Sequence, residues 1–323
     1  MQQLVDRLKA IAEPTRLRIV ELCAEGELAV SELTHILGQS QPRVSRHLKV
    51  LTDANIIVPM REGNWTFYRL EREASNIAVP LLTHLNRDDP VIAGDRQRLE
   101  AVRRKRRQAA DTYFSNHAPD WDAIRGMHVD ASQVEQGLLN LVPKGAFKVH
   151  LDIGTGTGRI LTVLGKRVAE SIGVDNSRAM LTIARDQASR AGHTGVSLRL
   201  ADMYALPLPD RSIDLVTIHL VLHYSDAPEQ VVAEAARVLR PGGRLILVDF
   251  APHQNEDLRQ KHAHRRLGFS EDEVRKWLKA SDLEWRKAEA LPGDILTVVL
   301  WSADKIADDQ SIPQPRIAGS PWI

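Results

Sequence analysis

Apolar and polar residues repeat with two different periods along the chain, and the change of period divides it in two. Over residues 1–88 the apolar positions recur every three or four residues and predict four helices, followed by strand-like runs at 56–61 and 65–70. Glu62-Gly63-Asn64 between these runs is a typical hairpin turn. From residue 148 onward, short apolar runs alternate with helical segments, which predicts a parallel sheet covered by helices.

The first part has the element order of a winged helix-turn-helix: mainly helical, with a β-hairpin as the wing. Its fourth helix begins after the N-cap residue Ser40, carries Pro42 in its first turn and ends at about Asp53. The outward positions of this helix are rich in donors that can read base edges or bind phosphate in a major groove. These positions are Gln41, Arg43, Ser45, Arg46, His47 and Lys49. At the tip of the hairpin, Arg61 and Asn64 are placed to reach a flanking backbone or minor groove. The alternative is a solvated polar face on a helical domain.

This first part resembles the ArsR/SmtB family of transcriptional regulators. The matching stretches are 13–18, 40–51, 61–65 and 68–70. The resemblance implies a homodimer that binds double-stranded operator DNA and releases it when an effector binds. Metal-sensing members carry a Cys-x-Cys pair before the third helix, where this sequence has Ala29 and Ser31. We therefore expect no thiolate metal site, and an effector of another kind.

Composition narrows the classes of protein to consider. The 323 residues suffice for two domains, and a net charge of +1 identifies no partner. The single cysteine, Cys23, excludes an internal disulfide. No apolar run approaches the roughly 18 residues that span a membrane, and no signal-peptide pattern opens the chain. We therefore expect a cytoplasmic protein without a membrane partner.

Positive charge is concentrated at 95–108, where seven residues are basic and two are acidic. This stretch predicts a basic linker helix, which either binds DNA phosphate or is a solvated connector. The aromatic residues Tyr113, Phe114 and Trp121 follow, and they either help to cap a cofactor pocket or pack between domains. The expected division is 1–88 for the winged helix, 89–120 for the linker, 121–303 for the second domain and 304–323 for a loosely ordered tail.

The second part is organised around the stretch Leu151-Asp152-Ile153-Gly154-Thr155-Gly156-Thr157-Gly158. A buried strand that ends in alternating glycines allows the backbone to approach a ligand, and the following helix directs its N–H groups at that ligand. The G-x-G-x-G spacing differs from the G-x-G-x-x-G of dinucleotide sites, because Arg159 stands where the third glycine would be. Asp152 beside the loop suits a ligand with positive charge, such as the sulfonium and ammonium groups of S-adenosylmethionine.

Two further acids end the next two strands. Asp175 ends the second strand, where a carboxylate can accept hydrogen bonds from both ribose hydroxyls, and Asp202 ends the third, where it can accept from an adenine amino group. Ligands of such sheets bind at the carboxyl ends of the strands. One acid at a strand end is commonly a helix cap or a loop residue. Three successive ones beside a glycine loop favour a nucleoside ligand.

This second part resembles the class I S-adenosylmethionine-dependent methyltransferases. The matching stretches are 151–158, 173–177, 201–203, 206–207, 214–224 and 237–245. The resemblance implies a Rossmann-like α/β fold with a seven-stranded, mostly parallel sheet in the order 3-2-1-4-5-7-6, the seventh strand antiparallel. It also implies that the glycines approach the methionine part, that Asp175 binds ribose, and that Asp202 with the Met203 backbone holds adenine. The expected cofactor-binding residues are Asp152, Gly154, Gly156, Gly158, Asp175, Asn176, Asp202 and Met203.

Methyl transfer requires alignment of the acceptor, and a base when the acceptor starts protonated. His219 and His253, near the ends of the fourth and fifth strands, are the candidate catalytic residues, whereas His223 matches the family pattern and is expected to be structural. The segment 262–266 lies where acceptor lids are usual. Its two histidines at i and i+2 do not share a helix face, so we expect no metal there.

Two functions remain open. One is a regulator fused to a working small-molecule methyltransferase, with S-adenosylhomocysteine as its product. The other is a regulator only, whose methyltransferase-like domain senses S-adenosylmethionine or S-adenosylhomocysteine as its effector. The histidine- and arginine-rich segment favours catalysis, and the absent metal motif favours sensing. The G-x-G-x-G spacing disfavours a dinucleotide oxidoreductase.

Overall fold

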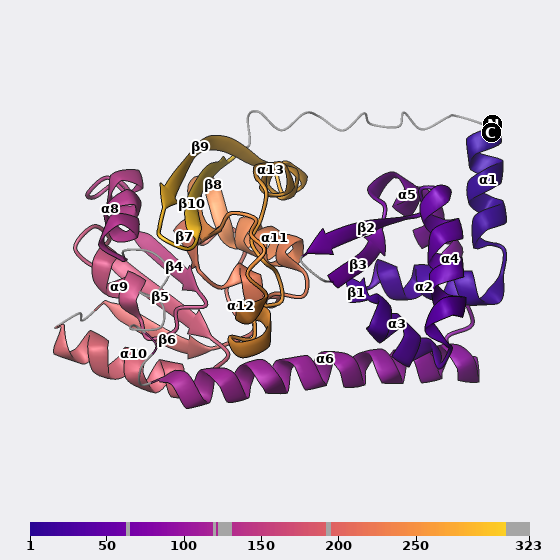
Figure 1. Cartoon of the computed structure of the whole chain (residues 1–323). Helices are drawn as coiled ribbons and strands as arrows, with labels where there is room; N and C mark the ends of the chain where they lie inside the picture. Colours follow the sequence, from indigo (N-terminus) through magenta and orange to yellow (C-terminus); the bar gives the residue numbers. More distant parts are fainter. Residues whose placement is uncertain (63–64, 119–120, 122–130, 192–194, 308–323) are drawn as a thin grey trace, which may run out of the picture. The chain divides into compact units, whose positions relative to one another are not determined.

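A computed structural model describes residues 1–62, 65–118, 121, 131–191 and 195–307 (Figure 1). The chain forms two compact units, which we call the first and the second unit. The first unit consists of Met1–Asn116, Tyr224–Ala227 and His253–Leu267, and the second of His117–His223, Pro228–Pro252 and Gly268–Ile323. The basic helix expected as a linker therefore lies almost entirely in the first unit, together with two short segments from the second half of the sequence.

The first unit is a winged helix-turn-helix, as the sequence predicts. Its elements are α1 (Gln2–Ile11), α2 (Pro14–Ala24), β1 (Leu28–Ala29), α3 (Val30–Leu37), α4 (Gln41–Asp53), β2 (Ile57–Glu62), β3 (Trp65–Leu70), α5 (Arg72–Leu82), α6 (Pro90–His117) and α12 (Glu256–Lys261). Strands β2 and β3 form the antiparallel wing, and the two-residue strand β1 pairs with the other edge of β3. The sequence did not predict β1 or α5.

Local sequence explains where these helices begin and end. Helix α2 begins at Pro14, and the side chain of Glu13 accepts a hydrogen bond from the Arg16 N–H at 2.8 Å. Helix α3 ends at Gly38, whose φ of 64° is a left-handed conformation that glycine adopts without strain. Helix α4 buries Val44, Leu48 and Leu51 at helical spacing, which leaves its polar face outside.

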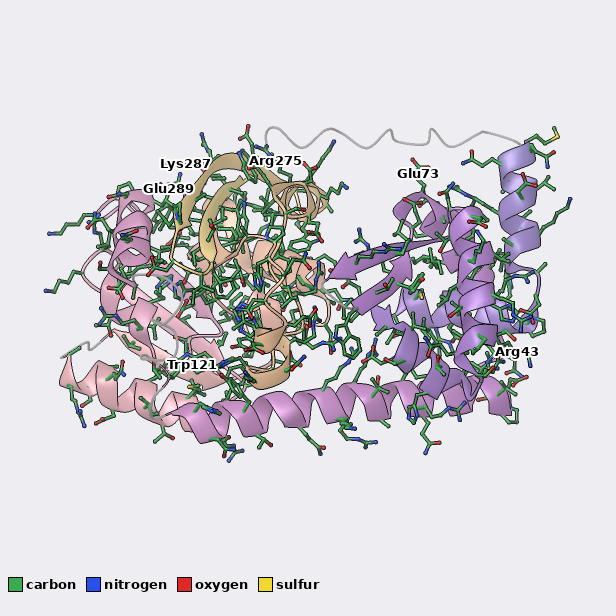
Figure 2. The ribbon with its side chains drawn as sticks, viewed as in Figure 1. Arg43, Glu73, Trp121, Arg275, Lys287 and Glu289 are labelled. Carbon is green, nitrogen blue, oxygen red and sulfur yellow. The ribbon has the colours of Figure 1, made fainter. Side chains whose placement is uncertain are left out.

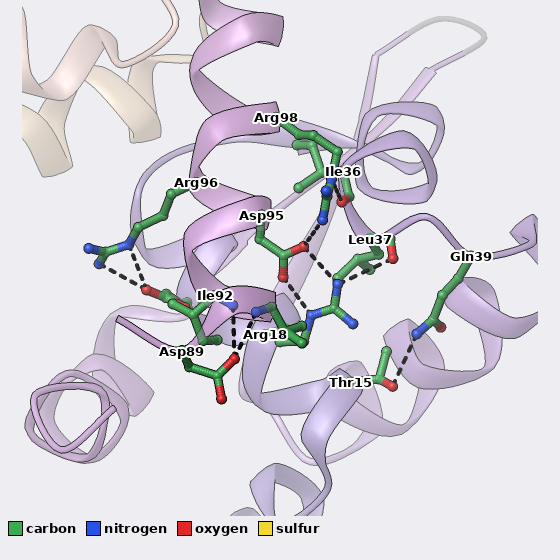
Figure 3. Close-up of polar contacts among 12 residues, drawn as sticks. Thr15, Arg18, Ile36, Leu37, Gln39, Asp89, Ile92, Asp95, Arg96 and Arg98 are labelled. Atoms are coloured by element: carbon green, nitrogen blue, oxygen red, sulfur yellow. Dashed lines mark hydrogen bonds and ion pairs between the residues drawn. The ribbon is translucent and has the colours of Figure 1, made fainter. Parts of the chain in front are cut away.

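Helix α6 is bound to the rest of the first unit by its charged side chains (Figure 3). Asp95, only 2% exposed, accepts hydrogen bonds from Arg18 at 2.5 and 2.7 Å and from Arg98 at 2.7 Å. Arg96 pairs with Glu21 of α2 at 2.9 Å. Because Asp95 is buried between two guanidinium groups, its charge is compensated, and removal of either arginine leaves part of that charge unpaired.

The second unit is a three-layer α/β fold. Its elements are α8 (Ala131–Leu141), β4 (Val149–Ile153), α9 (Arg159–Leu164), β5 (Glu170–Asp175), α10 (Arg178–Arg190), β6 (Val196–Leu200), β7 (Ile213–His219), the 3-10 helix η2 (Leu222–Tyr224), α11 (Pro228–Val238), β8 (Leu239–Phe250), α13 (Glu271–Ala280), β9 (Leu283–Pro292) and β10 (Thr297–Lys305). The seven strands lie in the order β6-β5-β4-β7-β8-β10-β9, and β10 is antiparallel to β8. This confirms the predicted order 3-2-1-4-5-7-6.

The central strands β4 and β7 are apolar on one face, whereas the alternating positions of their other face include the buried polar residues His150, Asp152 and Thr217. Leu151, Ile153, Val216 and Ile218 of β4 and β7 are no more than 1% exposed and belong to one core cluster. At one edge, β9 carries charged side chains, among them Lys287 and Glu289, which pair at 2.7 Å (Figure 2). Charges of this kind protect an edge strand from pairing with another chain.

No helix of the described residues combines the length and the apolar character that crossing a bilayer would require.

Candidate cofactor site and candidate DNA-binding surface

The glycine loop joins β4 to α9 and has a backbone that requires glycine. Gly154 and Gly158 have φ values of 68° and 82°, which side-chain-bearing residues rarely adopt. A Cβ atom at Gly154 would also lie 2.5 Å from a methyl carbon of Val221, and one at Gly158 would lie 3.1 Å from the Cβ of Ala184. The loop is therefore tightly packed against Val221 and Ala184, and it leads into the N-terminus of α9.

Two neighbours of the loop explain residues that the sequence left open. The Nε1 atom of Trp121 is the nearest atom, at 3.6 Å, to the place where a Cβ of Gly156 would be (Figure 2). Trp121 therefore lies over the glycine loop, which favours the capping interpretation; the residues after it, 122–130, lie outside the described part. Arg159, which replaces the third glycine, makes two hydrogen bonds of 2.7 Å to Glu135 of α8.

Asp175 lies at the end of β5 and contacts the loop directly. Its Oδ2 accepts the Gly156 N–H and its Oδ1 accepts the Ser177 N–H, both at 2.8 Å. Ser177 in turn is the N-cap of α10 and accepts a hydrogen bond from the Met180 N–H, as predicted. A carboxylate offers about four acceptor sites, which is the chemistry that the hydroxyls of a sugar require.

The other acids follow the neighbouring strands at the same end of the sheet. Asp152, 1% exposed, is the last acid of β4, and its Oδ1 accepts the Thr217 hydroxyl at 2.6 Å. Asp202 follows β6, is exposed, and accepts the Tyr204 N–H at 3.0 Å. Asn176 is exposed and Met203 is half-buried. The parallel register therefore brings the acids that end or follow β4, β5 and β6 to the carboxyl end of the sheet, as the sequence predicts.

The histidines of the second half fall into two groups. His223 and Asp249 are 2% and 0% exposed, and the Nδ1 and Oδ1 atoms of this pair lie 2.8 Å apart. Asp249 also accepts the Phe250 N–H at 2.8 Å, so the pair joins the ends of β7 and β8. This agrees with a structural role for His223. His219 is half-buried at the end of β7 in the second unit, whereas His253 belongs to the first unit.

The hydrogen bonding of His253 indicates which of its two ring nitrogens carries the proton when the ring is neutral. Its Nδ1 accepts the Asn255 N–H at 3.2 Å, so in the neutral ring the proton is on Nε2. The structure thus does not place His219 and His253 within one unit. Their assignment as catalytic residues stays a prediction.

The polar face of α4 is exposed, with one exception. Gln41, Arg43, Ser45, Arg46 and Lys49 are exposed, and Figure 2 shows Arg43 at this surface.

His47 differs from the other predicted DNA contacts. It is half-buried, and its Nδ1 lies 3.5 Å from a carboxylate oxygen of Glu13. Burial lowers the pKa of His47, and the neighbouring Glu13 opposes that effect. In this structure His47 therefore contacts the start of α2. At the wing, Arg61 is exposed and Asn64 lies outside the described residues.

The position of the family's metal site carries no ligating side chains. Ala29 is 2% exposed and Ser31 is exposed. Glu32 accepts the Ala29 N–H at 2.8 Å, which satisfies a backbone donor at the start of α3. Burial raises the pKa of the Cys23 thiol to about 12, so this cysteine stays protonated and unreactive.

Sequence reasoning missed an ion-pair network within the first unit. Arg106 of α6 donates from Nε to Glu32 at 2.9 Å and from Nη1 to Asp226 at 2.8 Å. Arg265 also donates to Asp226, at 2.8 Å. Asp226 follows β7 in the sequence and Arg265 follows β8. Asp226 thus pairs with Arg106 of α6 and with Arg265, and Arg106 pairs with Glu32 of α3.

Further contacts add to this network. Arg266 pairs with Glu27 at 3.2 Å, and both side chains are less than 10% exposed. The guanidinium of Arg259 lies over the ring of Phe67 in the wing strand β3, 5.3 Å from its centroid. The sequence signal for this network is the two basic runs. From the sequence alone, 95–108 indicates either phosphate binding or a solvated connector, and 262–266 indicates an acceptor lid. Their acidic partners are scattered along the sequence and could not be recognised.

The comparisons with known proteins agree with these two units. Residues 13–58 match the family described as bacterial regulatory protein, arsR family, and residues 151–247 match the methyltransferase domain family. The arsenic resistance transcriptional regulator ArsR1 of Pseudomonas putida is 52% identical over 66 residues, which are 20% of this chain and 52% of the relative. A demethylmenaquinone methyltransferase of Thermus thermophilus is 36% identical over 143 residues, which are 43% of this chain and 64% of the relative.

Solved structures share the fold of the second unit. The cyclase SpnF has a TM-score of 0.53 at 17% identity, covering 62% of this chain and 96% of that chain. A methyltransferase solved in complex with the Haloferax volcanii activator Trm112 has a TM-score of 0.51 at 21% identity, covering 60% and 97%. These identities show a common fold only, and the chain spans less than two thirds of the two curated relatives. Residues 13–58 are therefore similar to the arsR regulator family, and residues 151–247 are similar to the methyltransferase domain family.

Proposed function

We propose that the chain is a DNA-binding transcriptional regulator whose second unit transfers a methyl group from S-adenosylmethionine to a small molecule. The observation that supports this most directly is the placement of Asp152, Asp175 and Asp202 after three neighbouring parallel strands, beside the glycine loop. Carboxylates at these three places can accept hydrogen bonds from an ammonium group, a ribose and an adenine amine. A ligand with all three groups in one molecule matches that arrangement.

The residues of the loop also fit a polar ligand. The Oγ1 atom of Thr155 is buried and has no hydrogen-bond partner among the described residues. A buried hydroxyl without a hydrogen-bond partner is unfavourable. Binding of a ligand that supplies such a partner would therefore be favoured. In our proposal Gly154, Gly156 and Gly158 lie against the methionine part of the cofactor. Asp175 and Asn176 then bind the ribose, and Asp202 and Met203 bind the adenine.

When bound, S-adenosylmethionine supplies a methyl group on a positively charged sulfur, whose leaving group is already activated. The chain itself has to orient the acceptor and, when the acceptor is protonated, to remove a proton. We assign these tasks to His219 and His253. His253 with its proton on Nε2 is a hydrogen-bond donor suited to orienting an acceptor oxygen, and His219 is the candidate base.

Isothermal titration calorimetry with S-adenosylmethionine tests the cofactor assignment. We expect one site per chain, and a loss of at least about 100-fold in affinity for Asp175→Ala, because that side chain would bind the ribose and also positions the Gly156 N–H. Asp186→Ala removes an acid that is exposed on α10 and pairs with Arg190, and it should leave the affinity unchanged. Unchanged affinity in Asp175→Ala would contradict the site.

The first unit is proposed to bind operator DNA as a homodimer through α4 and the wing. Five of the predicted contact residues on α4 are exposed. Helices α1 and α5 are paired through Arg7 and Glu73, which lie 3.8 Å apart, and both expose large apolar side chains. These are Leu4, Val5 and Leu8 on α1, and Val79 and Leu81 on α5. A second copy of the chain is the partner that we propose for this apolar surface. DNA binding of this kind would place the protein in the cytoplasm.

One observation favours the second candidate function, ligand sensing. The start of α3, which metal-sensing relatives use for their effector, is here paired through Glu32 and Arg106 to Asp226. Asp226 follows the 3-10 helix η2, whose His223 is bonded to Asp249 of β8. A ligand that changes the ends of β7 and β8 would therefore act on the helices that position α4. Sensing additionally requires that the ligand bind the DNA-bound and free states with different affinities.

A further inference from the structure

A chain of buried polar groups runs inside the sheet beneath the glycine loop. Thr217 and His150, on β7 and β4, are both 0% exposed. The Thr217 hydroxyl lies 2.6 Å from Oδ1 of Asp152, and the Nε2 atom of His150 lies 2.8 Å from the same hydroxyl oxygen. Ser171 of β5 places its hydroxyl 3.5 Å from His150 Nδ1. Polar groups at the centre of a parallel sheet are costly unless they bond to one another.

The proton positions in this chain follow from the number of hydrogens available. The Thr217 hydroxyl has one hydrogen, and an ionised Asp152 only accepts, so that hydrogen points to Asp152. The hydroxyl oxygen then accepts from His150, which must carry its hydrogen on Nε2. Burial lowers the pKa of His150 to about 3, so the ring is neutral at physiological pH and its Nδ1 is an acceptor. The donors in this series of hydrogen bonds therefore all point the same way: Ser171 donates to His150, His150 donates to Thr217, and Thr217 donates to Asp152.

This direction has a consequence for the carboxylate. A hydroxyl polarised by an imidazole N–H is a stronger donor than an isolated hydroxyl, because successive hydrogen bonds reinforce one another. Thr217 and His150 stabilise the negative charge of Asp152 without neutralising it, since both are uncharged. They also fix the rotamer of a side chain that is only two residues before Gly154. An oriented carboxylate at this place suits a cationic ligand group.

We propose that Thr217 and His150 are positioning residues, which hold the side chain of Asp152 oriented toward the ammonium group of the methionine part of the cofactor. The inference rests on the proposed function, because it takes S-adenosylmethionine or S-adenosylhomocysteine as the ligand. It assigns to two strand residues a role in recognising the amino-acid part of the ligand rather than its nucleoside.

Two ligands separate this role from a general effect on the fold. S-adenosylhomocysteine has the amino-acid part, whereas 5′-methylthioadenosine has the same nucleoside and thioether but no ammonium group. Thr217→Val keeps the shape and removes the hydroxyl, and Thr217→Ser restores the hydroxyl. Ser302→Ala is the matched control, because Ser302 is 2% exposed in the same sheet and its hydroxyl donates to the Lys287 carbonyl at 3.4 Å.

Calorimetric affinities of both ligands give the result. We expect Thr217→Val to weaken S-adenosylhomocysteine by about tenfold or more, as for loss of a hydrogen bond to a charged group. Its affinity for 5′-methylthioadenosine should stay within about twofold, which also shows that the variant is folded. Thr217→Ser should recover most of the affinity, and Ser302→Ala should change neither ligand.

Should Thr217→Val fail to fold, His150→Phe removes the N–H donor and fills the same space, with the same preference between ligands expected at about threefold. Equal losses for both ligands, or no loss for either, would overturn the inference while leaving the cofactor site standing. A wild-type chain that binds neither ligand would overturn the proposed function, and this inference with it.

Discussion

The Nη1 atom of Arg106 lies 2.8 Å from Oδ1 of Asp226, so the segment that follows β7 is paired with the longest helix of the first unit. The same guanidinium is bonded to Glu32 near the start of α3. Both acids belong to the first unit, although they are far apart in the sequence. One arginine thus connects the residues that follow a strand of the cofactor-binding sheet to the helix that precedes α4.

Arg106→Gln should weaken the coupling between cofactor and operator. Glutamine keeps hydrogen-bonding capacity but cannot pair with both carboxylates, so we expect the ligand-induced change in operator affinity to fall by about fivefold. Affinity for S-adenosylhomocysteine alone should change by less than about twofold. Fluorescence anisotropy of labelled promoter DNA, with and without ligand, measures the ratio. Arg104→Gln, an exposed residue of the same helix, is the control. An unaltered ratio in Arg106→Gln would show that the coupling takes another path.

Arg46→Ala should weaken binding to the protein's own promoter. Arg46 is exposed on α4, where it can contact a base edge or phosphate, and loss of such a contact lowers affinity by about 10-fold to 100-fold. A gel shift with promoter DNA measures it. Arg190→Ala removes an exposed arginine from the second unit and should have no effect. A normal shift for Arg46→Ala would argue against α4 as the recognition helix.

His150 should make the second unit sensitive to acid. Its pKa of about 3 in the folded chain lies below the ordinary 6.5, because burial disfavours the charged ring. Between these two pH values the unfolded chain binds a proton that the folded chain does not bind. The contribution of His150 to the unfolding free energy is therefore fully present above about pH 7 and is lost as the pH falls. From pH 7 to pH 5 this group alone should cost about 2 kcal/mol of unfolding free energy.

The variant His150→Asn removes that titration. Its deficit in unfolding free energy relative to wild type, measured by urea unfolding, should therefore shrink between pH 7 and pH 5, whereas the exposed control His84→Asn should track the wild type. A deficit that stays constant with pH would show that His150 does not carry this acid sensitivity.

Leu8→Glu should convert the proposed dimer into a monomer. Leu8 is 41% exposed on α1, and a carboxylate buried in a dimer interface would be unpaired. Sedimentation equilibrium measures the mass. Ile295→Glu changes an apolar residue that is 63% exposed in the second unit, and it should leave the mass unchanged. A dimeric Leu8→Glu would place the interface elsewhere.

The strand order and the edge at which the acids lie could be predicted because they depend on local patterns. Apolar runs that alternate with helices specify a parallel sheet, and in such a sheet the residues after each strand meet at one edge. Strand β8 begins at Leu239, five residues before the apolar run that the sequence shows from Arg244 onward. The intervening Arg-Pro-Gly-Gly stretch interrupts the apolar pattern, although it lies in an irregular part of the strand. That irregularity arises from the register in which β8 pairs with β7, and the pattern of a single sequence does not specify this register.

The pairing of charged residues could not be predicted. The basic run in α6 has the composition of a phosphate-binding helix, but Arg96, Arg98, Arg103 and Arg106 are each paired with acids of the first unit. These arginines therefore support a connector that is bound to its domain. The position of His47 was missed for the same reason, since its contact with Glu13 comes from tertiary packing. Thr217 and His150 did have a signal, namely polar residues inside apolar strands.

The most direct test is a calorimetric titration of S-adenosylhomocysteine into the full chain, once alone and once saturated with its promoter DNA. The account predicts one site per chain in both cases. It also predicts dissociation constants that differ by about fivefold or more, because we propose that ligand binding acts on α4 through the contacts of Glu32, Arg106 and Asp226. No binding, or identical dissociation constants with and without DNA, would contradict it.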